Sequence, residues 1–273
     1  MFNVEYYCKG GIEMNNVIDV MMNRVSLRKY DERLVAKEHI DIILECAMRA
    51  PTAGNMMLYS IIKVEDQKKK DVLSKTCDNQ PFIAKAPLVL IFLADYQRWY
   101  DYYIHSQVSD YCKSKGVKFE GPSEANLMLA TCDAIIAAQN AVIAGEALGI
   151  GSCYIGDIME NYETHRELFN LPKWVFPVGM LCMGYYPEGY NKVKRERFDE
   201  KYIVYTDTYD ESYKDNIKDC FKNIERRFNE TNEFGAKNMG QVHYAIKTGA
   251  EFSKEMARSV KVALKNWNSE IIE

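Results

Sequence analysis

The chain has 273 residues, 47% hydrophobic and 27% charged, which is the composition of an ordinary soluble globular protein. Its net charge of −4 gives no reason to expect DNA or RNA as a partner. Eight cysteines and four histidines show neither a C-x-x-C pair nor a zinc-ligand spacing, so we expect no metal site and reduced thiols in the cytoplasm. No signal peptide is visible, and the longest uncharged run, 174–187, is too short to span a membrane.

A basic heptapeptide, 24–30, is the first candidate for a binding site. Arg24, Ser26 and Arg28 stand at positions i, i+2 and i+4, so their side chains can converge on one small anion. Guanidinium groups match phosphate oxygens in a bidentate manner, and a serine hydroxyl adds a short neutral donor. The apolar run before it, 17–22, is compatible with a buried helical turn. Two interpretations are open: a phosphate grip, or a solvated basic turn.

A helix, a turn and a strand are expected next. Apolar residues from Ile40 to Met48 recur at spacings of three and four, which indicates a helix that ends before Pro51. The small-residue turn 52–55 precedes an apolar strand over 59–64. Such a turn lets a ligand approach the backbone, but it also suits a plain helix-to-strand connection.

The middle of the chain alternates between charged and apolar segments. We expect a charged surface helix over 66–77, a turn at 80–82, and a strand over 88–94 that is buried on both faces because it is apolar throughout. The aromatic-rich segment 96–119 is expected to be partly helical. Its rings could cover a planar ligand, or they could simply pack or lie at an interface.

A long apolar helix over 125–149 is expected to lie at the centre of the domain or at a dimer axis. Small residues line one of its faces, which permits tight packing. A short strand runs from Gly151 into a turn at Asp157, and Gly156 could expose its amide to a ligand. A short helix over 162–169 and a buried strand over 175–185, broken by its proline and glycines, follow.

A second basic cluster follows Pro187, and it comprises Lys192, Lys194, Arg195 and Arg197. It could complete the phosphate site or remain a solvated loop. From Asp210 onward one apolar stripe predicts helix again, and 239–267 repeats apolar residues at spacings of three and four. This last helix suggests an arm that docks on the body of the protein or on a second subunit.

Taken together, the segments 24–30, 50–55, 139–157 and 178–185 resemble the nitroreductase family of flavin enzymes. The resemblance covers roughly 15–205, and it implies an α+β fold with a mixed, mainly antiparallel sheet flanked by helices. It also implies an intertwined homodimer with FMN at its interface. We therefore expect an N-terminal leader over 1–14, an FMN-binding domain over 15–205 and a C-terminal helical extension over 206–273.

The resemblance also assigns cofactor-binding residues. The residues implied to contact the FMN phosphate and ribityl end are Arg24, Val25, Ser26 and Arg28, with the late pair Arg195 and Arg197. Those implied to lie beside the flavin are Pro51, Thr52, Ala53 and Asn55, and Gln80 is implied to meet the pyrimidine ring. Those implied to lie near N5 are Tyr154, Ile155, Gly156 and Asp157. The sequence departs from the common family pattern at Val25, often an arginine, and at Met57, frequently a glutamine.

The implied activity is FMN-dependent oxidoreduction of small molecules. NADPH or NADH would pass hydride to the flavin, and a nitroaromatic, a quinone or free flavin would then accept it in a ping-pong cycle. Such chemistry needs no protein nucleophile, so no catalytic side chain is assigned, and Cys153 is expected to be buried and inert. The alternatives are an FMN-binding sensor or carrier without turnover, and reductive removal of a substituent from an aromatic ring.

Overall fold

The computed structural model of the chain describes residues 16–269, so the predicted leader over 1–14 lies outside the described residues. The chain forms two compact units. The larger unit ends at Lys192 and resumes at Glu255, and the smaller unit comprises Val193–Lys254. The sequence-based boundary near residue 205 stays a prediction.

A four-stranded antiparallel sheet forms the centre of the larger unit. Its order is β1 (Tyr59–Lys63), β2 (Leu88–Asp95), β4 (Val175–Tyr185) and β3 (Ile150–Ile155). A parallel bridge between Ser26 and Ser152 brings the basic heptapeptide to the outer edge of β3. The sheet is therefore mixed but mainly antiparallel, which confirms the predicted α+β fold class.

Strand β4 is continuous, so the prediction that its proline and glycines break it is wrong. Pro177 pairs with Leu93, and Gly179 pairs with Phe92, which leaves one extra residue of β4 at this point. This β-bulge accommodates Pro177, because a proline cannot donate to a regular ladder.

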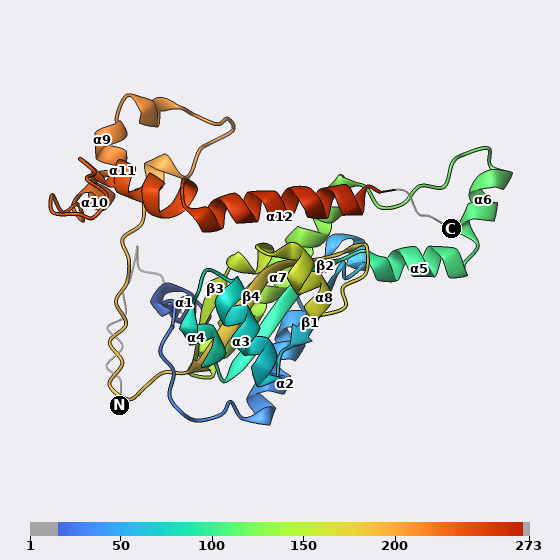
Figure 1. The fold of residues 1–273 in the computed structure, drawn as a ribbon, viewed down its shortest axis with the longest axis horizontal. Helices are drawn as coiled ribbons and strands as arrows, with labels where there is room; N and C mark the ends of the chain where they lie inside the picture. The colour runs from blue at the N-terminus through green and yellow to red at the C-terminus, as the bar shows by residue number, and fades with distance from the viewer. Residues whose placement is uncertain (1–15, 270–273) are drawn as a thin grey trace. The chain divides into compact units, whose positions relative to one another are not determined.

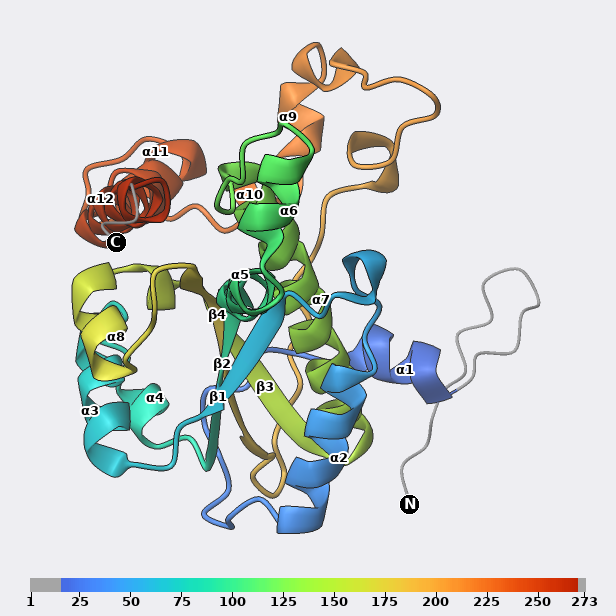
Figure 2. The ribbon, with the colours of Figure 1, turned by 90° about the vertical axis from the view of Figure 1, so that its right-hand side faces the viewer.

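Helices cover both faces of the sheet (Figure 2). On one face lie α2 (Lys37–Met48) and α7 (Glu124–Ala147); on the other lie α3 (Gln67–Thr76), α4 (Pro81–Ala84) and α8 (Tyr162–Leu168). These elements agree with the sequence-based expectations, except that the predicted turn at 80–82 is the start of α4. Pro81 is the first residue of α4, a position where its missing N–H costs nothing.

Helix α7 packs against the sheet through small buried residues, as expected. It is the one helix among residues 16–269 that is long and apolar enough to cross a membrane, and its packing identifies it as the core helix of this unit. Its opposite face exposes large apolar side chains, namely Met128, Leu129, Ile135 and Ile136.

The first helix, α1 (Asn16–Asn23), corrects another expectation. The run 17–22 is helical but not buried, because Val17, Met21 and Met22 are each more than half exposed. The aromatic segment forms α5 (Gln97–His105) and α6 (Val108–Ser114), which Figure 1 shows extending beyond the end of β2.

The smaller unit is helical only in short pieces where the apolar stripe from Asp210 onward predicts helix. They are the 3-10 turns Glu200–Tyr202 and Ser212–Lys214 and the helices α9 (Ile217–Cys220), α10 (Lys222–Glu225) and α11 (Met239–His243). A π-helical turn, Tyr244–Thr248, separates α11 from α12 (Glu251–Trp267). The predicted final helix is therefore interrupted.

The C-terminal half of α12 belongs to the larger unit and packs on its other elements, which confirms one of the two predicted roles of the arm. The indole of Trp267 donates to Pro122 O at 3.0 Å, and Trp174 donates to Trp267 O at 3.1 Å. Closer to the middle of the helix, buried Ser259 accepts a hydrogen bond from the Tyr162 amide.

Gly184 on β4 tests this packing. A Cβ atom there would lie 2.8 Å from the Tyr30 ring and 2.9 Å from Pro87 Cδ, both on rigid side chains. We expect Gly184→Ala to lower the free energy of unfolding by about 1–3 kcal/mol in urea titrations. Gly156→Ala is the control, because a Cβ atom there meets nothing within 4 Å. Equal stability of the two variants would contradict this account.

Candidate functional site

The basic heptapeptide is held against the sheet edge by its backbone and by Leu27. The Leu27 amide donates to Ser152 O at 2.9 Å, and the Leu27 side chain is fully buried. Because side chains alternate in an extended segment, burial of Leu27 turns Ser26 and Arg28 outward, and both are exposed.

The structure brings Arg24, Ser26 and Arg28 together at the Cys153 thiol of β3. The bridge between Ser26 and Ser152 places the heptapeptide beside this thiol; burial raises the pKa of Cys153, while Arg28, Ser26 and Arg24 oppose the shift in part. Cys153 is 2% exposed, in agreement with the buried role predicted for it. The Nε atom of Arg24 is shielded from solvent and has no hydrogen-bond partner among the described residues. A buried guanidinium donor without an acceptor suits an anionic ligand at this point.

The turn after β3 meets Gln80 from a distant part of the chain. Nε2 of Gln80 donates to Asp157 Oδ2 at 2.7 Å and to Cys77 O at 3.0 Å, which leaves its carbonyl oxygen as an acceptor for a ligand. Gly156 is exposed, its φ of −77° is ordinary, and the space around it is open. Neither packing nor backbone conformation therefore requires a glycine there.

The turn between α2 and β1 extends over 52–58, so it includes the predicted small-residue turn 52–55, and its backbone is unusual. Gly54, Asn55 and Met57 all have φ values between 50° and 57°. The buried carboxylate of Asp133, on α7, accepts hydrogen bonds from the Ala53 and Leu58 amides. Sequence reasoning missed Asp133, although it is the one charged residue between Glu124 and Glu146.

The aromatic segment is joined to this turn. Nε1 of Trp99 on α5 donates to Met56 O at 2.7 Å, and the Trp99 ring packs edge-on against Tyr102 with centroids 5.8 Å apart. The rings therefore pack together beside the turn, and their contact with a ligand or at an interface stays a prediction.

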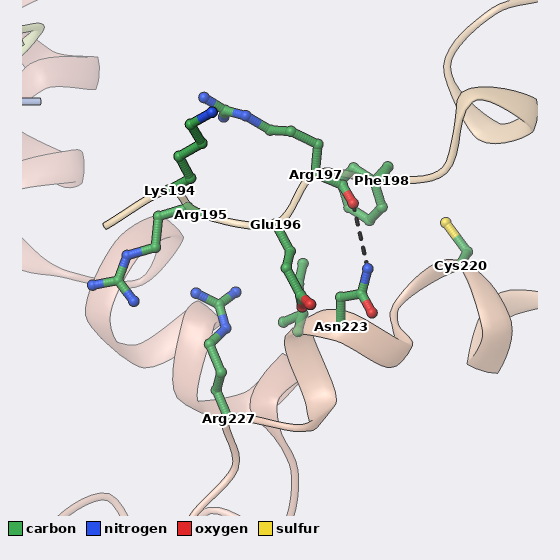
Figure 3. A pocket seen from close by; sticks show the side chains of 9 residues that line it. Lys194, Arg195, Glu196, Arg197, Phe198, Cys220, Asn223 and Arg227 are labelled. Atoms are coloured by element: carbon green, nitrogen blue, oxygen red, sulfur yellow. Dashed lines mark hydrogen bonds between the residues drawn. The ribbon is translucent and has the colours of Figure 1, made fainter. Parts of the chain in front are cut away.

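The late basic pair lies in the smaller unit, at a pocket of about 330 Å³. Its lining residues are Lys194, Arg195, Glu196, Arg197, Phe198, Cys220, Asn223, Ile224 and Arg227. In Figure 3 the guanidinium groups of Arg195 and Arg227 point toward the same space, whereas Arg197 extends beside Lys194. Sequence reasoning missed Arg227. The convergence of this pair with Arg24 and Arg28 stays a prediction.

A buried carboxyl group, Glu160, lies near Asp157 and was also missed. It is 4% exposed, and its Oε1 has no hydrogen-bond partner within residues 16–269. Burial raises its pKa to about 8, and the charges of Asp157, Asp78 and Glu255 add to the shift.

Comparison with known proteins identifies the family. The family model described as "Nitroreductase family" matches residues 21–185, which is more than half of the chain. The chain belongs to the nitroreductase family. The matched residues of this nitroreductase-family protein begin in α1 and end with β4, so they include the whole sheet and the basic heptapeptide.

Similar proteins extend the likeness beyond the matched segment. The FMN reductase (NADPH) of Bacillus subtilis (strain 168) is 32% identical over 196 residues, 72% of this chain and 75% of the relative. The CR(VI) reductase of Pseudomonas sp. (strain G-1) is 30% identical over 212 residues, 72% of this chain and 83% of the relative. The solved structure of B. megaterium NfrA2 is 27% identical, has a TM-score of 0.75, and covers 95% of this chain and 100% of its own.

Glu160 generates a prediction about pH. The Glu160 carboxyl group holds its proton more tightly in the folded chain than in the unfolded chain, because folding raises the pKa of Glu160 from 4.5 to about 8. The stability that this proton contributes is complete below the unfolded value and is lost as the pH rises through 8. We expect Glu160→Gln to be more stable than the wild type, by on the order of 1 kcal/mol, in urea unfolding on the alkaline side of neutrality but not in mild acid.

Glu163→Gln is the matched control. Its carboxylate is bound by Arg258, which lowers its pKa, so this variant should gain no stability in alkali. A Glu160→Gln effect of the same size at both pH values would contradict the assignment of a shifted proton.

Proposed function

We propose that this protein binds FMN and uses it to carry hydride from NAD(P)H to a small acceptor. The observation that carries the proposal is the gathering of Arg24, Ser26 and Arg28 at one point of β3, with Arg24 Nε buried and unpartnered within the described residues. This arrangement suits a phosphate monoester, because each group is a hydrogen-bond donor and two of them are cations. Relatives named FMN reductase and "NADPH-dependent oxidoreductase" support the choice of FMN and a nicotinamide reductant.

The residues of the chain would bind and orient the cofactor. Arg24, Ser26 and Arg28 hold the phosphate end, with Arg195 and Arg197 as further cationic contacts. The backbone at Gly156 would lie beside the ring, because a Cβ atom there would meet nothing within 4 Å and the space is open. When bound, FMN supplies the hydride chemistry.

Two further groups would recognise the flavin by hydrogen bonds. The free carbonyl oxygen of Gln80 would accept from the flavin pyrimidine, and the exposed side-chain amide of Asn55 would offer a donor and an acceptor. Pro51, Thr52 and Ala53 form the adjoining backbone. Tyr154, Ile155 and Asp157 complete the turn at the end of β3.

A homodimer accounts for the exposed apolar side chains of the larger unit. Besides those on α7, exposed apolar residues are present on α1 and α2, namely Val17, Met21, Met22, Ile42 and Met48. A second copy of the chain would cover these helices. The seven cysteines within residues 16–269 are free, which supports a cytoplasmic location.

Binding of FMN is the first test. The purified protein should show flavin absorbance bands after incubation with FMN and gel filtration. Arg28→Ala should weaken the affinity by about 2 kcal/mol, because a charge-assisted phosphate contact is lost. Lys29→Ala, which removes a neighbouring exposed cation, is the control. A protein that acquires no flavin would refute the proposal, and unchanged affinity of Arg28→Ala would refute its phosphate contact.

Turnover separates an enzyme from a flavin sensor or carrier. NADPH or NADH should bleach the flavin anaerobically in stopped-flow absorbance, and a nitroaromatic or a quinone should restore the oxidised spectrum. Flavin that binds but is not reduced by either nucleotide would favour the sensor or carrier.

Dimerisation is tested by Ile136→Glu. A charge at the exposed centre of α7 should convert a dimer to a monomer in sedimentation velocity, because a buried unpaired carboxylate is costly. Glu124→Gln at the start of α7 is the control and should leave the mass unchanged. A wild-type protein that sediments as a monomer would contradict the proposed dimer.

A further inference from the structure

Asp133 is a buried charge in an otherwise apolar stretch of α7. Its side chain is on the face that packs on the sheet, and the residue is 2% exposed. A carboxylate buried among apolar groups is costly unless its oxygens are hydrogen-bonded. The fold therefore retains a group that packing alone does not favour.

Both oxygens of this carboxylate bind the turn 52–58. Oδ1 accepts from the Ala53 amide at 3.0 Å, and Oδ2 accepts from the Leu58 amide at 3.2 Å. The two donors stand at the beginning and the end of the turn. One side chain thus sets the spacing between the ends of the loop.

The backbone between those two donors is strained. Met57 adopts a left-handed φ of 50°, which costs about 1 kcal/mol or more for such a side chain, and Asn55 adopts one of 57°, which asparagine accepts at a lower cost. Such a conformation persists only when its surroundings impose it. Within the turn, the Met57 amide donates to Thr52 Oγ1 at 3.2 Å, and Trp99 binds the Met56 carbonyl.

The Asn55 side chain is what this arrangement presents to solvent. Asn55 is exposed, and its side-chain amide makes no hydrogen bond within residues 16–269. Asn55 lies between the two backbone amides that Asp133 binds, those of Ala53 and Leu58.

We propose that Asp133 is a positioning residue for the flavin, acting through the turn to orient Asn55 and the neighbouring backbone. This inference rests on the proposed function. A carboxylate suits the role because it only accepts hydrogen bonds, so each oxygen dictates the direction of one backbone N–H. An asparagine in its place would set an amide donor against one of those N–H groups.

The test compares Asp133→Asn with Ser259→Ala. Ser259 is also fully buried and also accepts a backbone hydrogen bond, from Tyr162, but it lies on α12 and contacts neither the turn nor the heptapeptide. Both variants should unfold at a lower temperature than the wild type. Asp133→Asn alone should weaken FMN binding about tenfold or more and shift the reduction potential of the bound flavin.

A double-mutant cycle tests the route of the effect. If Asp133 acts through Asn55, then Asn55→Ala should weaken FMN binding by itself, and adding it to Asp133→Asn should cost clearly less than the sum of the two changes. Additive losses of FMN affinity would overturn the inference. An Asp133→Asn protein with wild-type FMN affinity and wild-type flavin reduction potential would overturn it as well. A wild-type protein that binds no FMN would instead remove the proposed function, and this inference with it.

Ala53→Pro keeps the inference testable should Asp133→Asn fail to fold. It deletes one of the two N–H donors without altering α7, and the ψ of 155° at Thr52 is compatible with a following proline. Weaker FMN binding and a shifted flavin potential are expected here too. Unchanged values for both would contradict the role of Asp133.

Discussion

The pairing of the basic heptapeptide with β3 is the interaction on which the site depends. Without it, β3 would be an edge strand with a row of unpaired backbone groups. The bridge between Ser26 and Ser152 covers part of that edge, and the buried Leu27 side chain anchors it. The same contact delivers Arg24, Ser26 and Arg28 to the Cys153 thiol. One structural interaction therefore both protects the sheet and assembles three donors.

Hydrogen-bonded carboxylates organise the rest of the larger unit around that edge. Asp133 binds the two ends of the turn before β1, and Asp157 binds Gln80. Glu146, whose side chain is 3% exposed, accepts from Tyr186 at 2.6 Å and from Lys192 at 3.1 Å. Because a carboxylate only accepts, each of these groups orients donors from a distant segment, and neutral apolar packing could not do so with the same directionality.

Local patterns predicted the regular elements well where burial and periodicity agree. Strand β2 is apolar from Leu88 to Ala94 and buried along its whole length, and α2 follows from apolar spacing. Errors arose where a neighbouring segment decides the outcome. Pro177 stays within β4 because β4 forms a bulge where it pairs with β2. The apolar residues of α1 are exposed, although their pattern suits a buried helix.

The C-terminal region shows the same division. The apolar stripe after Asp210 satisfies a helical period, yet the chain forms short pieces there, with separate helices at α9 and α10. The interruption before α12 involves Gly249, where a Cβ atom would lie 2.8 Å from the Tyr244 ring. The spacing of apolar residues predicts which residues favour burial, but it does not predict where the chain turns.

By itself, the sequence determined the fold class, most element boundaries and, through four ordered segments, the family. Tertiary structure alone decided which distant groups meet: Gln80 with Asp157, and Asp133 with the backbone on either side of Asn55. The physical reason is that helix and strand patterns arise from interactions between near neighbours in the chain. Hydrogen bonds between residues some eighty positions apart depend on how the layers pack, and no local pattern encodes that packing.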